Sequence, residues 1–178
     1  LGDVYKRQDV LWVYPVQGGL YLDLVSRSAS KFRELPYHIA AIGSPTPLME
    51  EYRYDLLVDL IVTAKANLPL TAPVHLFGAG HPMIFPLIVA LGVDTFDSAA
   101  YAIYAKDDRL MTESGTVRLS ELEELPCNCP VCLKYTAKEL RELPKPLRVK
   151  EIARHNLYVA AKELKRVREA IRDGSLWE

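Results

Sequence analysis

Residues 74–96 read VHLFGAGHPMIFPLIVALGVDTF, and this stretch sets the fold class of the chain. A short apolar run over residues 74–77 is closed by a glycine-rich turn, and a segment of helical length follows over residues 82–91. A second short apolar run then occupies residues 93–96. Apolar runs of this length, bounded by glycine, are typical of buried strands. The order therefore predicts two parallel strands joined by a helix.

The same alternation extends towards the N-terminus. Residues 10–16 and 37–42 have strand-like apolar runs, and helical segments are predicted over residues 20–35 and 48–68. Four strand–helix units with buried-type strands predict an α/β fold with a parallel sheet, either half of a barrel or a small doubly wound sheet. The first helix is expected to bury one face, made of Leu20, Leu24, Ala29 and Phe32.

Beyond the last strand the pattern changes. Residues 109–119 predict a hairpin, and residues 136–143 and 149–171 predict a short and a long helix. The long helix is expected to bury the apolar residues at helical spacing, namely Ile152, Leu157, Ala160, Leu164, Val167 and Ile171. Residues 1–8, LGDVYKRQ, read like the translated end of a sequencing adaptor, so we exclude them from the fold.

The three cysteines lie together in CNCPVC, residues 127–132. Closely spaced thiolates are typical zinc ligands, and a structural zinc needs four. Three cysteines in six residues do not form a secreted disulfide framework, which favours a reducing compartment. His155 is the best fourth ligand, because the other histidines fall in the strand–helix region. Cys127, Cys129, Cys132 and His155 therefore predict one closed, structural Zn²⁺ site, with three free thiols as the alternative.

Charge divides the chain unevenly. Residues 1–133 hold ten Lys and Arg against sixteen Asp and Glu, whereas residues 134–178 hold twelve against seven. A basic C-terminal segment fits contact with a polyanion, although on charge alone a solvated helix face is the more common explanation. No apolar run of about 18 residues occurs, and no signal peptide is recognisable, so we expect a cytoplasmic protein without a membrane span.

The ends of the predicted strands carry the candidate chemistry. In order along the chain they reach Gln17, Gly43, Gly78 and Asp97. Catalytic residues of β/α barrels lie at these ends. Asp94 and Asp97 flank the last strand on opposite faces, so Asp97 is the candidate nucleophile and Asp94 a structural residue. A helix N-cap for the segment beginning at residue 98 is the alternative role of Asp97.

Four motifs together resemble the tRNA-guanine transglycosylases. They are VQGG at residues 16–19, FGAGHP at 77–82, FDSAAY at 96–101, and CNCPVC at 127–132 with HNLY at 155–158. Two of them, FDSAAY and FGAGHP, are similar to the archaeal, archaeosine-forming branch. The queuine-type enzymes of bacteria carry a cysteine after the aspartate instead.

The resemblance implies the last four strands of a zinc-containing (β/α)₈ barrel over residues 9–120, and a zinc-binding subdomain with the C-terminal helix over residues 121–178. It implies exchange of guanine at position 15 of tRNA for 7-cyano-7-deazaguanine, with Asp97 forming a covalent intermediate with the tRNA. Base-binding roles are implied for five residues: Gln17, Gly43, Ser44, Phe77 and Gly78. Ser44 departs from the family, which usually has a second glycine there.

The resemblance also implies a homodimer, and places the general base and the C-terminal RNA-binding module outside this sequence. We therefore expect the isolated chain to be inactive. Two alternatives remain: a non-catalytic, tRNA-binding relative, and a queuine-type transglycosylase. The archaeosine synthase that acts later is disfavoured by the complete cysteine cluster and the intact Phe96-Asp97.

Overall fold

The computed structural model describes residues 10–43 and 46–177. The segment of residues 1–8 and the candidate Ser44 therefore lie outside the described residues. The chain divides into two compact units. Unit 1 comprises the residues up to Phe77 together with residues 91–96, and unit 2 comprises residues 78–90 and the chain from Asp97 onward.

Unit 1 is built on a four-stranded sheet. Its strands β1 (Val13–Val16), β2 (Ile39–Ile42), β3 (Val74–Leu76) and β4 (Thr95–Phe96) lie side by side in chain order. All three pairings are parallel. The inner strand β2 is almost wholly buried, as strands covered on both faces are. The predicted α/β fold with a parallel sheet is confirmed.

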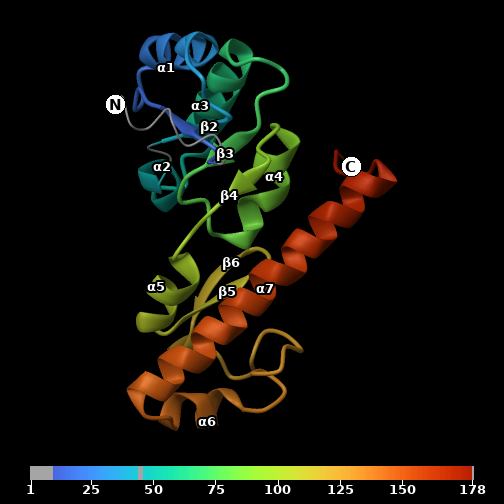
Figure 1. Ribbon diagram of the computed structural model, residues 1–178. Coiled ribbons are helices and arrows are strands. Elements are labelled where there is room, and N and C mark those ends of the chain that lie inside the picture. The colour runs from blue at the N-terminus through green and yellow to red at the C-terminus, as the bar shows by residue number, and fades with distance from the viewer. Residues whose placement is uncertain (1–9, 44–45, 178) are drawn as a thin grey trace. The chain divides into compact units, whose positions relative to one another are not determined.

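Two helices pack together beside this sheet (Figure 1). They are α1 (Leu22–Ser30), which continues as the 3₁₀ turn η2 (Lys31–Glu34), and α3 (Tyr54–Asn67). The buried residues of the first are Val25, Ala29 and Phe32. The prediction that Leu20 and Leu24 share this face is wrong, since both are exposed. Leu20 precedes the helix, which begins at Leu22. The buried face is formed by Val25, Ala29 and Phe32, which are spaced three or four residues apart.

The predicted single helix over residues 48–68 is two helices. The short helix α2 (Thr46–Glu50) ends before α3 begins at Tyr54. Tyr52 has a φ of +56°, and the amides of Tyr52 and Arg53 donate to the carbonyls of Met49 and Leu48. This is a Schellman ending with tyrosine where glycine is usual. No glycine marks the break, so the sequence pattern did not reveal it.

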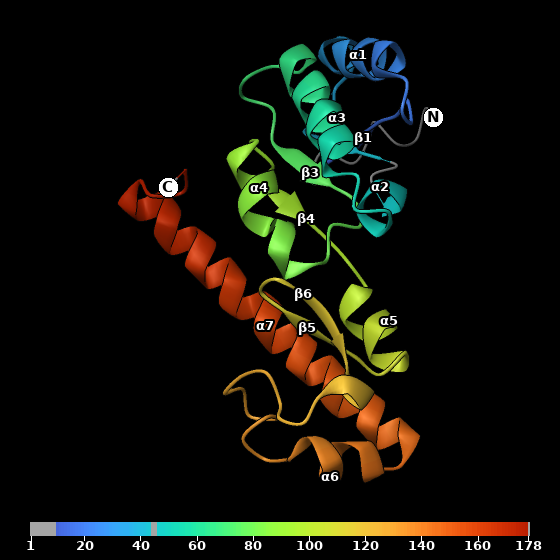
Figure 2. The ribbon, with the colours of Figure 1, turned by 180° about the vertical axis from the view of Figure 1, so that it is seen from behind.

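Unit 2 contains a β-hairpin whose first strand contacts two helices, α5 (Ala100–Lys106) and α7 (Lys145–Asp173) (Figure 2). The turn η3 (Pro82–Ile84) and α4 (Phe85–Ala90) come first, followed by α5. The predicted hairpin is confirmed as β5 (Arg109–Thr112) and β6 (Gly115–Arg118), followed by η4 (Leu119–Glu121). The core between α5, the hairpin and the last helices consists of Ala105, Leu110, Leu119, Leu140 and Ile152.

The last two helices follow the cysteines. The predicted short helix is confirmed as α6 (Ala137–Glu142), which begins with a capping box formed by Thr136 and Glu139. Helix α7 (Lys145–Asp173) is longer than predicted and ends at Gly174, which has a φ of +77°. Its buried face includes four polar residues, so the purely apolar face predicted for it is partly wrong. Leu157 and Ile171 are 48% and 53% exposed.

One arginine ties the start of α7 to the end of α5. Arg148 donates Nε and Nη2 to the two carboxylate oxygens of Asp108, at 2.8 and 3.0 Å. Its Nη1 donates to the carbonyls of Arg141 and Leu143. The hydrogen bond to Asp108 raises the pKa of Arg148. A bidentate contact of this kind fixes both direction and distance.

None of the helices in the described residues is long and apolar enough to cross a membrane.

Candidate metal centre and strand-end site

The three cysteines occupy a tight turn in unit 2. The amide of Cys129 donates to the Cys127 sulfur and the amide of Cys132 donates to the Cys129 sulfur, both at 3.4 Å. A further amide, that of Leu133, donates to the carbonyl of Cys129. Amide donors aimed at sulfur stabilise a thiolate over a thiol. The local backbone is therefore arranged for charged sulfur atoms.

His155 completes the cluster from helix α7. Its Nδ1 lies 3.6, 3.4 and 3.3 Å from the sulfurs of Cys127, Cys129 and Cys132. The sulfurs of Cys127 and Cys132 are 3.6 Å apart, and all four ligand atoms lie within 4.8 Å of one another. In a tetrahedral site with bonds of ~2.3 Å to sulfur and ~2.0 Å to nitrogen, the ligand edges are ~3.8 Å and ~3.5 Å. The four residues therefore fit a zinc ion.

The orientation of the imidazole supports the same ligand set. The Nε2 atom of His155 lies 2.9 Å from the carbonyl oxygen of Met111, to which it can donate. A proton on Nε2 leaves the lone pair of Nδ1 free for a metal, which is the usual arrangement of a ligating histidine. His155 is fully buried, and this burial lowers its pKa and favours the neutral ring.

The thiols need a cation to ionise here. Burial raises the pKa of Cys127 and Cys132, and crowding by the neighbouring thiols adds to the shift at Cys132. Three thiolates so close together repel one another, whereas a divalent cation at their centre reverses that effect. Among the described residues the donor set has three sulfurs and one nitrogen and no fifth group, so it is suited to a structural ion.

Asn156, the next residue of α7, is a structural residue that the sequence reasoning did not assign. It is fully buried. Its Oδ1 accepts from the amide of Met111 at 2.8 Å, and its Nδ2 donates to the carbonyls of Tyr101 and Arg109 at 3.0 and 3.2 Å. Together with His155 it binds both polar groups of Met111. A polar residue beside a ligand on the inner face of a predicted helix is the pattern that could have identified it.

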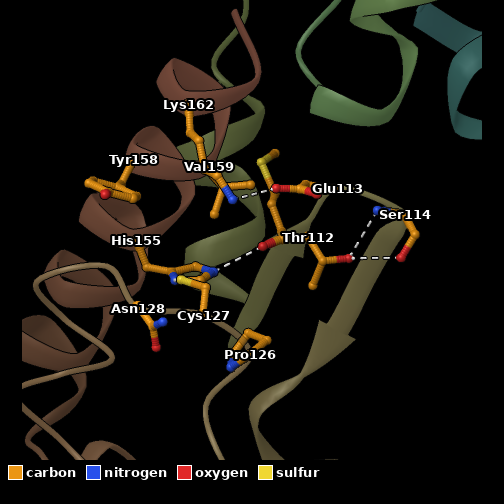
Figure 3. Close-up of a pocket in the computed structure, with 11 residues that line it drawn as sticks. Thr112, Glu113, Ser114, Pro126, Cys127, Asn128, His155, Tyr158, Val159 and Lys162 are labelled. Carbon is orange, nitrogen blue, oxygen red and sulfur yellow. Dashed lines mark hydrogen bonds and ion pairs between the residues drawn. The ribbon is translucent and has the colours of Figure 1, made fainter. Parts of the chain in front are cut away.

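A cavity of about 480 Å³ adjoins the cluster. Cys127 and His155 line this cavity. Lys162 of α7 and Glu113 of the hairpin turn, which form an ion pair, line it as well (Figure 3). The Nζ to Oε1 distance is 2.7 Å, and the hydrogen bond from Lys162 lowers the pKa of Glu113. Both side chains are more than half exposed, so this pair adds little to stability.

Asp97 directly follows strand β4. Its Oδ1 accepts from the amide of Gly78 at 3.3 Å, and both residues belong to unit 2. Gly78 has a φ of +74°, a backbone conformation that favours glycine. Helix α5 has Ala99 at its N-cap, and the Ser98 hydroxyl accepts from the Ala100 amide. The alternative role of Asp97 as the cap of this helix is therefore wrong.

Asp94, at the other side of β4, has a structural contact. Its Oδ2 accepts from the amide of Val74, the first residue of β3, at 2.8 Å. This bond satisfies a strand-end donor and joins β3 to the segment before β4. The structural role predicted for Asp94 is confirmed.

Two more candidates lie together in unit 1. A Cβ atom on Gly43 would overlap the side-chain amide of Gln17, so the glutamine lies against the bare backbone of Gly43. Phe77, just after β3, is 41% exposed and packs edge-on against His75 with ring centroids 4.9 Å apart. The structure thus describes two pairs of candidates, one in each unit: Gln17 with Gly43, and Gly78 with Asp97.

Comparison with known proteins gives matches over nearly the whole chain. A family model described as queuine tRNA-ribosyltransferase matches residues 3–178. Proteins named tRNA-guanine(15) transglycosylase are similar: that of Aeropyrum pernix is 54% identical over 94% of this chain, and that of Saccharolobus solfataricus 51% over 98%. That of Methanocaldococcus jannaschii is 55% identical over 92%. The matched regions span only 33%, 36% and 25% of these relatives.

Proposed function

Because the chain belongs to the queuine tRNA-ribosyltransferase family, we propose that it is part of an enzyme that exchanges guanine at position 15 of tRNA for 7-cyano-7-deazaguanine. Position 15 is favoured over the queuine-type reaction by the relatives at 51–55% identity, all named for that position. The product would be the precursor of archaeosine.

Asp97 is the proposed nucleophile. Its carboxylate forms a bond to the ribose C1′ while the bond from C1′ to guanine breaks, and the bond's electron pair leaves with the base, which takes up a proton. The incoming base then loses its ring proton, attacks C1′ and displaces the carboxylate. Two displacements retain the configuration at C1′, as in other reactions of glycosidic bonds through a carboxylate. The position of Asp97 after β4, with the Gly78 amide on Oδ1, supports this role.

The bases would bind along the other strand ends. Gln17 would hydrogen-bond the carbonyl edge, the backbone at Gly43 and Ser44 would meet the polar edge, and Phe77 with Gly78 would contact the ring face. The close approach of Gln17 to Gly43 and the partly exposed ring of Phe77 support this pocket. A side chain on Gly43 would displace Gln17, so the glycine is part of the pocket's shape.

The zinc site would have a structural role. Cys127, Cys129, Cys132 and His155 would hold one Zn²⁺, which joins the cysteine turn to α7 and leaves no open position for a substrate. We place this site in a subdomain of residues 121–178 that follows the last four strands of a (β/α)₈ barrel. The four parallel strands in chain order support the barrel assignment.

The remaining parts of the proposal concern the whole protein. The 178-residue chain spans between a quarter and about a third of its relatives, so we expect it not to catalyse exchange by itself. The general base would come from the part of the protein that precedes these strands. We also propose a homodimer that acts on tRNA in the cytoplasm.

The observation that carries the proposal is the carboxylate at the exit of β4, and its test is the covalent adduct. In the full-length protein, Asp97→Asn should abolish the tRNA adduct on a denaturing gel while zinc content is unchanged. Asp94→Asn is the matched control, because an amide oxygen can still accept from Val74. An adduct that survives Asp97→Asn would exclude Asp97 as the nucleophile. No adduct with the unaltered protein would favour a tRNA-binding relative without catalysis.

A further inference from the structure

Helix α7 carries five exposed basic residues in one row. They are Lys150, Arg154, Lys165, Arg168 and Arg172, which we call the basic row. An α-helix turns by ~100° per residue, so these five positions fall within a sector of ~60°. The buried face of α7, with Ile152, His155 and Val159, lies on the opposite side. The basic row therefore points away from the core of unit 2.

Acidic residues of α7 do not share this sector. Glu151 and Glu163 are buried, with Arg154 and Arg166 as their partners. Glu169 lies at the edge of the row, 3.8 Å from Lys165. Within the described part of the chain, no ion pair involves the other three members of the row. The row thus presents a positive strip, although residues 1–133 as a whole are acidic.

The dimensions of the row suit an extended polyanion. Its ends are separated by 22 residues, or ~33 Å at ~1.5 Å per residue. The three members nearest the C-terminus line a hollow of about 310 Å³ on the helix surface. Leu157 and Tyr158 are exposed between Arg154 and Lys165, the members of the row on either side of them along the helix. Guanidinium and ammonium groups spaced in this way can contact successive phosphates, and an exposed tyrosine can pack against a ribose or base.

We propose that the basic row binds the sugar–phosphate backbone of tRNA, outside the site of base exchange. The identity of the polyanion as tRNA rests on the proposed function. The chemistry requires a phosphodiester chain rather than a base sequence, because long exposed cations contact phosphates without reading bases. The row would hold the substrate in position while contributing nothing to the bond changes at C1′.

The test uses a triple charge reversal in the full-length protein. Lys165, Arg168 and Arg172 are changed together to Glu, and tRNA binding is measured by filter retention over a range of salt concentrations. The matched control reverses three exposed basic residues of unit 1, namely Arg27, Lys31 and Arg33, with the same change in net charge. Circular dichroism and zinc content establish that both variants are folded.

We expect the row variant to bind tRNA at least tenfold more weakly at physiological salt, and the slope of log K against log salt to fall by about 2–3, since each phosphate contact contributes about 0.7–0.9. The KM for tRNA should rise by a similar factor, while kcat at saturating tRNA stays within twofold. The control should bind like the unaltered protein.

Equal binding and salt dependence in the row variant and the unaltered protein would overturn the inference and leave the row as a solvated helix face. An equal loss in the control variant would also overturn it, because the effect would then follow net charge alone. If the unaltered protein binds tRNA through the row but exchanges no base, the proposed function fails and the inference stands.

Discussion

Replacing Asn156 by alanine should loosen the contact between β5 and α7. The substitution leaves the buried amide of Met111 without an acceptor, and an unsatisfied buried donor costs about 1–3 kcal/mol. The carbonyls of Tyr101 and Arg109 each lose a donor, at about 0.5–1.5 kcal/mol per hydrogen bond. The expected total of about 2–6 kcal/mol is a large fraction of the usual stability of a domain.

Amide hydrogen exchange of the β5 peptide in the zinc-loaded, full-length protein measures this loss locally. At about 1.4 kcal/mol per factor of ten, exchange at Met111 should be faster by a factor of roughly 30 or more. Asn67→Ala is the control, because Asn67 makes its contacts in unit 1, to the Thr63 carbonyl and the Ser30 hydroxyl. If β5 exchanges no faster in the Asn156 variant than in the control, the three hydrogen bonds do not hold the strand.

Two further predictions concern unit 2. Arg148→Lys should destabilise the protein by about 1–2 kcal/mol in urea denaturation, because a lysine cannot reproduce the paired contact to Asp108. Lys138→Ala, at an exposed ion pair, should change stability by less than about 0.5 kcal/mol, and equal effects would contradict the reasoning. Burial lowers the pKa of His81, so folding favours its neutral ring. Its stabilisation is present above the ordinary pKa of about 6.5 and is lost as the pH falls through the lower, folded value. His81→Gln, which can still accept from Met83, should flatten the fall in melting temperature below pH 6.5, and an unchanged slope would exclude His81 as its source.

The strand pattern of unit 1 could be predicted because parallel, buried strands are short apolar runs with clear ends. The predicted strands over residues 10–16 and 93–96 were too long, since both runs begin before the strands β1 and β4 do. The break between α2 and α3 could not be predicted. Tyrosine rarely adopts the left-handed conformation that Tyr52 has there, so nothing in its identity indicates a helix end.

The buried face of α7 could be predicted only in part, because its inner side is not uniformly apolar. Ile152 and Val167 are buried as expected, but they share that face with Glu151 and Glu163. These carboxylates are neutralised by arginines three residues further along the helix. A prediction from apolar periodicity assigns only apolar residues to the buried face. It therefore left out Glu151 and Glu163 and wrongly included Leu157 and Ile171.

The metal ligands could be predicted from spacing, since tetrahedral zinc imposes a small set of ligand types and distances. The geometry of Cys127, Cys129, Cys132 and His155 agrees with that set. The roles of Gln17, Gly43, Ser44, Phe77, Gly78 and Asp97 towards a base remain predictions. These roles concern contacts with a bound base at the strand ends. The periodicity of apolar residues predicts helices and strands, and it carries no information about such contacts.

Met111 is bound through both of its backbone polar groups by consecutive residues of one helix, His155 and Asn156. Its position along β5 is therefore fixed relative to α7. A residue inserted into or deleted from β5 would disrupt both bonds at once, whereas residues 123–126 have no such double attachment in the described part of the chain. Variation in chain length among related proteins should accordingly gather in residues 123–126 and be absent from β5.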